Sequence, residues 1–247
     1  MKACFFAGLC FFLLTGPAGA QPAYLAAIQK ANQDYLKGEY AQAAAGYEEV
    51  VAQGIINGNL RYNLGNAYLQ QGKLGPATFN YLKALRLLPR SEDIRANLAL
   101  AQRQTQDLLE WRQPHPAGEV LFWLEEFTLA EHITALTLLN LLFWAGLGVR
   151  LFRRNPWTGR MAHLLLGLFI AGMVSTGARW HLESNWNWAV VAAKTVDLMP
   201  GRGFSNDPLL QLHEGAIVTV LSEKGQWMEL QLPDGRQGWA VREALLT

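Results

Sequence analysis

Residue types able to do chemistry are sparse in this 247-residue chain, which holds two cysteines and five histidines. The histidines show no spacing typical of a zinc site: His115, His132, His163, His181 and His213. His213 and Glu214 are neighbours, but adjacent side chains of a strand point to opposite faces, so we do not expect them to share a metal. No nucleophile elbow, phosphate loop or dinucleotide fingerprint is present. We therefore expect a protein that is not an enzyme and uses no metal or cofactor.

Both cysteines lie in an N-terminal segment typical of a secretory signal. A positive residue precedes a short apolar run, and residues 16–20 read Gly-Pro-Ala-Gly-Ala, as before a cleavage site. Cleavage before Gln21 would remove Cys4 and Cys10, and with them any disulfide or thiolate ligand. We predict that residues 1–20 are a signal peptide; the alternative is that they remain as a membrane anchor.

Composition narrows the class of protein further. The formal net charge is +1, so the chain has no basic surplus for binding nucleic acid. Charged residues make up 17% of the chain, below the roughly 25% of soluble domains. This combination indicates soluble segments joined to much more apolar ones.

A repeat of period 34 organises residues 21–110. A shift of 34 superposes identical residues: Asn32 and Asn66, Gly38 and Gly72, Ala43 and Ala77, Tyr47 and Tyr81, Asn63 and Asn97. Small residues such as Gly65 and Ala84 let antiparallel helices approach closely, and Pro89 ends a helix. The segment resembles the tetratricopeptide repeat. We predict an α-helical solenoid of two repeats followed by a capping helix.

A solenoid of this kind offers a concave groove rather than a catalytic pocket. In the repeat frame six residues fall on the groove side: Ile28, Asn32, Tyr35, Tyr62, Asn66 and Leu69. They either bind a protein partner or are surface and packing residues. A clamp for acidic peptide C-termini needs Lys and Arg at groove positions, and Ile28 and Asp93 stand at two of these. That ligand class is therefore not expected.

Two uncharged apolar segments, residues 133–149 and 161–178, are long enough to span a membrane. They predict a two-helix transmembrane hairpin over residues 133–178; the alternative is an apolar hairpin in a soluble protein. Asn140 and His163 interrupt the apolar runs. A hydrogen bond across the hairpin is the favoured interpretation, and a contact with a partner is the other.

Charge predicts the orientation of this hairpin. Residues 119–131 carry four glutamates and no Lys or Arg, within a linker or interfacial segment over residues 111–132. The loop between the spans carries four arginines and no acid: Arg150, Arg153, Arg154 and Arg160. By the positive-inside rule the loop is cytoplasmic. Both flanking domains then lie in the periplasm, as a signal peptide also requires.

Residues 186–247 predict a small all-β domain, because short alternating strands follow one another between turn signals such as Pro-Asp-Gly. The phrases around residues 212–215, 225–227 and 234–239 resemble a bacterial SH3-type domain, which implies a small barrel. Trp227 and Trp239 either form a ligand surface or fill the barrel, and packing is the favoured interpretation.

The order of these segments resembles the BatE family of Bacteroides aerotolerance-type operons. Its most specific part is the phrase over residues 62–98, from Tyr-Asn-Leu-Gly-Asn-Ala-Tyr to Ile-Arg-Ala-Asn-Leu. The resemblance implies partners in the envelope: von Willebrand factor A-domain membrane proteins, a BatD-like protein and a MoxR-type ATPase.

Together these observations predict a non-enzymatic scaffold of the bacterial inner membrane. It would present a helical groove and an SH3-like domain on the outer side for protein–protein interaction. The alternative function is a cell-wall sensor that binds peptidoglycan through the SH3-like domain.

Overall fold

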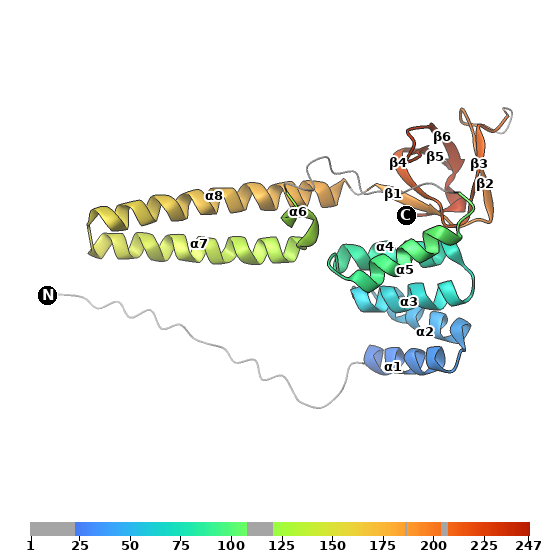
Figure 1. The fold of residues 1–247 in the computed structure, drawn as a ribbon, viewed down its shortest axis with the longest axis horizontal. Helices are drawn as coiled ribbons and strands as arrows, with labels where there is room; N and C mark the ends of the chain where they lie inside the picture. Colours follow the sequence, from blue (N-terminus) through green and yellow to red (C-terminus); the bar gives the residue numbers. More distant parts are fainter. Residues whose placement is uncertain (1–22, 108–120, 186, 204–206) are drawn as a thin grey trace.

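The computed structural model describes residues 23–107, 121–185, 187–203 and 207–247, which form three units (Figure 1). We call these the helical stack (residues 23–104), the apolar hairpin (residues 129–184) and the β-unit (residues 188–246). The predicted signal peptide, residues 1–20, lies outside the described residues. So does much of the predicted linker, residues 111–120.

The helical stack consists of two antiparallel helix pairs and a fifth helix. The helices are α1 (Ala23–Leu36), α2 (Tyr40–Ala52), α3 (Gly58–Gln70), α4 (Leu74–Leu87) and α5 (Glu92–Gln104). Gly38 and Gly72 turn the chain within each pair at φ angles of 82° and 72°, where a side chain would be strained. Asn57 and Ser91 cap α3 and α5 by accepting backbone N–H bonds. The predicted capping helix corresponds to α5, which ends at Gln104, before the end of the predicted solenoid segment at residue 110.

Small residues set the spacing within the stack. A Cβ atom on Gly65 would lie 2.7 Å from the Tyr81 ring, so only glycine lets α3 and α4 approach this closely. Tyr47 and Tyr81 are fully buried at equivalent places in the two helix pairs. The stack is therefore built as the 34-residue repeat predicts: small residues admit a large aromatic ring from the paired helix.

The apolar hairpin is formed by α7 (Leu129–Phe152) and α8 (Pro156–Ser184), preceded by the short helix α6 (Trp123–Glu126). Both long helices are long and apolar enough to cross a membrane, with mean hydropathies of 1.6 and 1.7. A capping box begins α7: Thr128 Oγ1 accepts from Glu131 N, and the Glu131 carboxylate accepts from Thr128 N.

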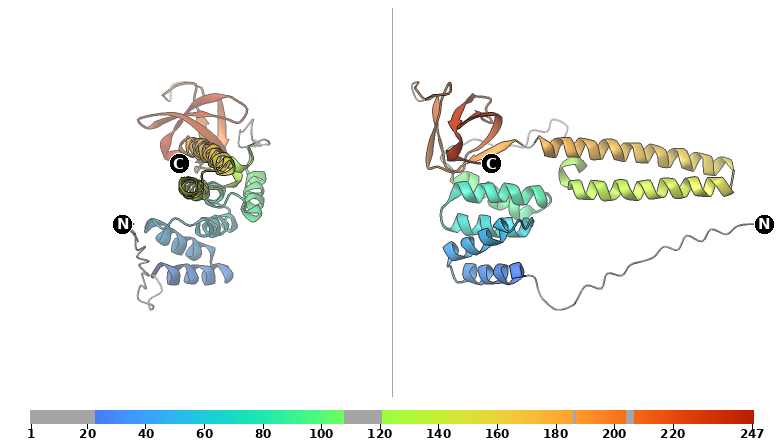
Figure 2. Two further views of the ribbon diagram at one scale, coloured as in Figure 1. Left: turned by 90° about the vertical axis from the view of Figure 1, so that its left-hand side faces the viewer. Right: turned by 180° about the vertical axis from the view of Figure 1, so that it is seen from behind.

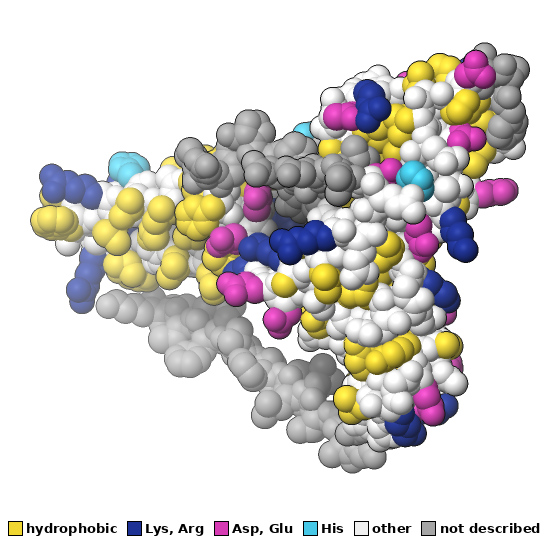
Figure 3. Space-filling view, turned by 45° about the vertical axis from the view of Figure 1, so that its right-hand side comes forward, with side chains coloured by type: hydrophobic (Ala, Val, Ile, Leu, Met, Phe, Trp, Pro, Cys, Tyr) yellow, Lys and Arg dark blue, Asp and Glu magenta, His cyan; other side chains and the backbone are white. Residues whose placement is uncertain are grey.

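The two polar residues of the hairpin do not form the hydrogen bond across it that the sequence favoured. Neither Asn140 nor His163 makes a hydrogen bond within the described part of the chain. The two helices instead meet through apolar contacts, including stacked rings of Phe143 and Phe169 at 6.0 Å. Most of the remaining hairpin surface is exposed and apolar, as Figure 3 shows along its sides.

The β-unit contains seven strands: β1 (Trp188–Val191), β2 (Thr195–Leu198), β3 (Leu210–His213), β4 (Ile217–Lys224), β5 (Trp227–Gln231), β6 (Gln237–Val241) and β7 (Leu245–Leu246). Five form an antiparallel sheet in the order β6-β5-β4-β1-β7, and β2 pairs with β3. A single bridge between Met199 and Trp239 joins the two sheets. The described strands do not close into the predicted barrel, because β2–β3 continues the large sheet only through that bridge.

The β-unit packs directly on the helical stack, and the hairpin projects away from both (Figures 1 and 2). Val190 and Ile217 share one buried apolar cluster with Tyr81 and Leu82 of α4. A Cβ atom on Gly75 would lie 2.5 Å from the Val191 carbonyl oxygen, so α4 approaches β1 backbone to backbone. The helical stack and the β-unit thus share part of their core.

Candidate interaction site

The helical stack contains the same hydrogen-bonded triad twice, 34 residues apart. Tyr47 Oη donates to Asn32 Oδ1 at 2.6 Å, and Asn63 Nδ2 lies 3.4 Å from the same oxygen. In the second copy, Tyr81 Oη donates to Asn66 Oδ1 at 2.7 Å, and Asn97 Nδ2 donates to it at 3.0 Å. Each triad connects three successive helices, so it fixes how one helix pair stacks on the next.

Burial disfavours ionisation of the two tyrosines of these triads. Loss of solvent raises the pKa of Tyr47 to about 12, with smaller contributions from Tyr35 and Asp34. Burial also raises the pKa of Tyr81, followed by the effects of Tyr62 and Tyr35. Both phenols therefore remain hydrogen-bond donors at physiological pH, and neither is poised to act as a base.

A small pocket of about 210 Å³ opens beside the first triad. It is lined by six residues: Asn32, Tyr35, Leu36, Tyr47, Asn63 and Asn66. The structure thus brings together three predicted groove residues, Asn32, Tyr35 and Asn66. Leu36 belongs to the pocket although sequence analysis missed it. The residue is 84% exposed.

The other predicted groove residues lie elsewhere. Ile28 is half-buried against the apolar cluster of the first helix pair. Tyr62 and Leu69 pack against the cluster of the second pair, and the Tyr62 hydroxyl accepts from Asn97 Nδ2 at 2.9 Å. These three residues contribute to packing between repeats, the other interpretation that the sequence left open.

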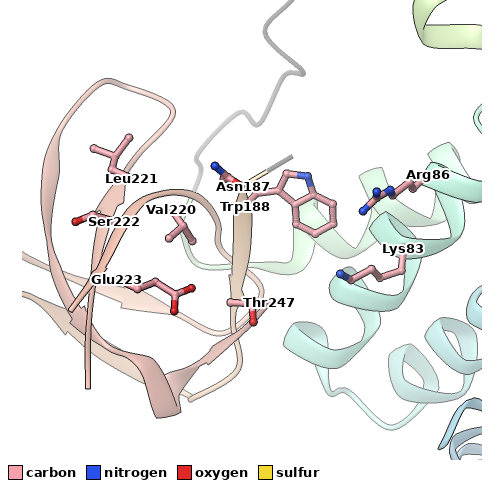
Figure 4. Close-up of a pocket in the computed structure, with 9 residues that line it drawn as sticks. All are labelled: Lys83, Arg86, Asn187, Trp188, Val220, Leu221, Ser222, Glu223 and Thr247. Atoms are coloured by element: carbon pink, nitrogen blue, oxygen red, sulfur yellow. The ribbon is translucent and has the colours of Figure 1, made fainter. Parts of the chain in front are cut away.

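A second cavity, of about 280 Å³, lies between α4 of the stack and the β-unit (Figure 4). Lys83 and Arg86 enter it from α4, facing Trp188 of β1 and Glu223 of β4. The Lys83 ammonium lies 5.0 Å from the Phe79 ring centroid and 5.8 Å from that of Trp188. Burial lowers the pKa of Lys83, and the charges of Arg86 and Arg61 lower it further.

Two ion pairs hold the stack to the base of the hairpin. Arg86 donates through Nε and Nη2 to Glu183 Oε1, at 3.2 and 3.1 Å. Arg90 Nη2 lies 2.5 Å from Glu131 Oε1, and its guanidinium stacks over the Phe127 ring at 4.8 Å. The position of the stack relative to the hairpin is therefore specified on both α7 and α8.

Polar residues also join the stack to the β-unit. His213 Nδ1 lies 2.8 Å from Asp107 Oδ1, and the Gly75 N–H donates to the Glu214 carboxylate at 3.0 Å. The sequence argued against a metal site at His213 and Glu214. It did not predict that these residues join the β-unit to the stack, because their partners Asp107 and Gly75 lie more than 100 residues earlier in the chain. Among the described residues, no three His, Cys, Asp or Glu side chains gather as metal ligands would.

The two predicted tryptophans of the β-unit have different environments. Trp227 is only 8% exposed and is part of the packed interior. Trp239 is half-buried, with Arg202 at 5.5 Å and Lys224 at 5.8 Å from its ring centroid. Of the pair, only Trp239 presents a surface to a ligand.

Comparison with known proteins assigns no family to this chain. It matches no model of a protein family and no curated protein. Its function is therefore inferred from the geometry above and from the patterns of its sequence.

Proposed function

We propose that this protein is a non-enzymatic, membrane-anchored scaffold. Its helical stack, interpreted as a tetratricopeptide-type solenoid, would hold a protein partner while the hairpin fixes it at the membrane. The observation that carries the proposal is the pair of contacts Arg86–Glu183 and Arg90–Glu131. They connect the stack to both helices of the hairpin, while the pocket beside Asn32 stays open.

The proposed compartment follows from charge. The arginine-rich loop between the spans is cytoplasmic by the positive-inside rule, and the stack and the SH3-type β-unit are periplasmic. The resemblance to the BatE family supports the same arrangement. It suggests von Willebrand factor A-domain membrane proteins and a BatD-like protein as partners, with a MoxR-type ATPase in the same system.

The pocket suggests how such a partner would be recognised. Its amide and phenol groups are uncharged, and the oxygens of Asn32 and Asn66 already accept bonds from tyrosines. Tyr35 and Leu36 are the side chains left to contact a partner. We therefore propose an apolar contact with a neutral segment of the partner, without a charge clamp.

Site-specific photo-crosslinking in membranes tests this function. A photoreactive residue at position 36 should give a discrete crosslinked species whose mass spectrum identifies a membrane protein. Position 56 is the matched control, because Ile56 is 83% exposed on the same stack but does not line the pocket. Equal crosslinking at both positions, or none at position 36, would refute the proposal that this pocket binds a protein partner.

Trp239 favours a second candidate function, peptidoglycan binding through the β-unit. An indole flanked by two cations suits a polymer that carries both sugar rings and carboxylates. The test is retention of the full chain, in detergent, on purified sacculi. Trp239→Ala should abolish retention, whereas Trp157→Ala, which removes a tryptophan stacked with Arg160 in the hairpin, should not. No retention of the unaltered chain would exclude this function.

A further inference from the structure

A further cavity, of about 810 Å³, lies at the tip of the apolar hairpin, where α7 ends and α8 begins. One wall is apolar, with Trp144, Leu147, Gly148 and Leu151. The other carries the guanidinium groups of Arg150 and Arg154. The cavity therefore combines an apolar wall on α7 with two cations at the tip of the hairpin. Figure 3 shows basic side chains gathered at this tip.

The charges of this cavity have no counterpart in the hairpin. No Asp or Glu occurs between Glu131 and Glu183, and the hairpin projects away from the other units (Figure 1). Neither Arg150 nor Arg154 forms an ion pair within the described residues. Two cations gathered without a carboxylate favour an anion supplied from outside the chain.

The start of α8 strengthens this preference. A Cβ atom on Gly159 would lie only 3.9 Å from the Arg150 guanidinium carbon, so that side chain lies against the first turn of α8. The first turn of α8 carries partial positive charge, which favours an anion there, whereas Arg150 itself lies in the last turn of α7, where the helix end favours a cation. Arg150 and Arg154 thus line one cavity together with Pro156 at the start of α8.

The apolar wall indicates that the anion carries a hydrocarbon chain. Trp144 is 63% exposed, and no atom lies within 4 Å of the place where a Gly148 side chain would begin. An open slot beside an exposed indole, one to two turns inside the apolar helix, can accept an acyl chain. Free phosphate would use the two arginines but leave this slot empty.

We propose that the tip of the hairpin is a binding site for an anionic phospholipid. The lipid phosphate binds Arg150 and Arg154, and an acyl chain lies along Gly148 beside Trp144. The inference requires that the hairpin spans the bilayer, but it is independent of the groove and of any protein partner.

Native mass spectrometry of the full chain in detergent tests the site, with phosphatidylglycerol and phosphatidylcholine of the same acyl chains as probes. The unaltered protein should retain one phosphatidylglycerol in preference to phosphatidylcholine. Arg150→Gln with Arg154→Gln should lower that retention by about tenfold, since both substitutions remove a direct charge-assisted bond to the lipid phosphate. Gly148→Leu, which fills the slot without a change in charge, should lower it as well.

A second double variant is the matched control. Arg153→Gln with Arg160→Gln removes the same charge from the same loop, but neither residue lines the cavity. Its retention of phosphatidylglycerol should fall by less than about threefold. Equal losses in the two double variants would show general charge attraction and overturn the site. Displacement of the lipid by inorganic phosphate, or retention unchanged by Gly148→Leu, would overturn the assignment to a lipid.

Discussion

Arg86 and Glu183 lie 97 positions apart in the chain, yet two nitrogens of the guanidinium donate to one carboxylate oxygen. Arg179, one helical turn before Glu183, approaches the other oxygen at 3.8 Å. One carboxylate thus connects α4 of the helical stack with the end of α8. Because Arg179 is almost fully buried, this connection sets how the stack stands on the membrane anchor.

Glu183→Gln should weaken this junction. It removes the carboxylate charge that Arg86 and the buried Arg179 share, and we expect a loss of about 2 kcal/mol in the free energy of unfolding. Chemical denaturation of the full chain in detergent measures it. Glu223→Gln is the control, since its pair with Arg242 is exposed and should cost less than about 0.5 kcal/mol. Equal losses would contradict a structural role for Glu183.

Tyr47→Phe and Tyr81→Phe should destabilise the stack by similar amounts, because each removes the same bond from one copy of the repeated triad. We expect about 1 kcal/mol for each variant. The asparagine oxygen left behind still faces a donor from the next helix, which limits the cost. Circular dichroism during denaturation gives both values. A loss confined to one variant would show that the two copies are not energetically equivalent.

The repeat explains why much of the stack could be predicted from sequence. Glycines at one period mark the turns, and alanines and tyrosines at the same period mark the core, so helix pairs follow from local pattern. The apolar runs and the Thr128–Glu131 capping box place the hairpin helices in the same way. These signals depend on residues close together in the chain.

The contacts between units could not be predicted, because they carry no periodicity. Asp107 contacts His213 through polar atoms. Polar side chains occur at many surface positions, so this pair leaves no signal in the sequence. The exact bounds of the strands could not be predicted for a related reason: strands of two to four residues, such as β1, β2, β3 and β7, give too few alternations to define their ends. Leu36 was missed as a pocket residue because an exposed leucine at a helix end looks incidental without its neighbours.

Stability should fall at alkaline pH through the buried tyrosines. The pKa of Tyr47 is raised from 10.0 to about 12, so the fold favours the neutral phenol. Its contribution is complete below pH 10 and is lost between about pH 10 and 12, by up to about 1.4 kcal/mol per pH unit. The lowered pKa of Lys83 acts with the opposite sign. Urea denaturation of the unaltered protein and of Tyr47→Phe isolates the effect of Tyr47 from that of Lys83. The difference in stability between these two proteins should shrink only above pH 10. A constant difference would contradict a raised pKa.

Gly75→Ala should push the β-unit away from the helical stack. The new methyl group would lie 2.5 Å from the Val191 carbonyl oxygen and 3.0 Å from the Ala192 Cα, and both are backbone atoms that cannot turn aside. We expect a loss of about 1–3 kcal/mol, as for other overpacked sites. Gly159→Ala is the control, because it is also in the first turn of a helix but has no atom closer than 3.9 Å.

The two variants differ in what should move. In Gly75→Ala, strain at α4 and β1 should weaken the nearby bonds from Gly75 to Glu214 and from His213 to Asp107. Hydrogen exchange should therefore quicken at the His213 amide, which donates to the Asp107 carboxylate across this interface. Gly159→Ala should leave exchange there unchanged, because it alters only the far tip of the hairpin. Unchanged exchange in both variants would mean that the β-unit is held by its apolar contacts alone, with the polar bonds contributing little.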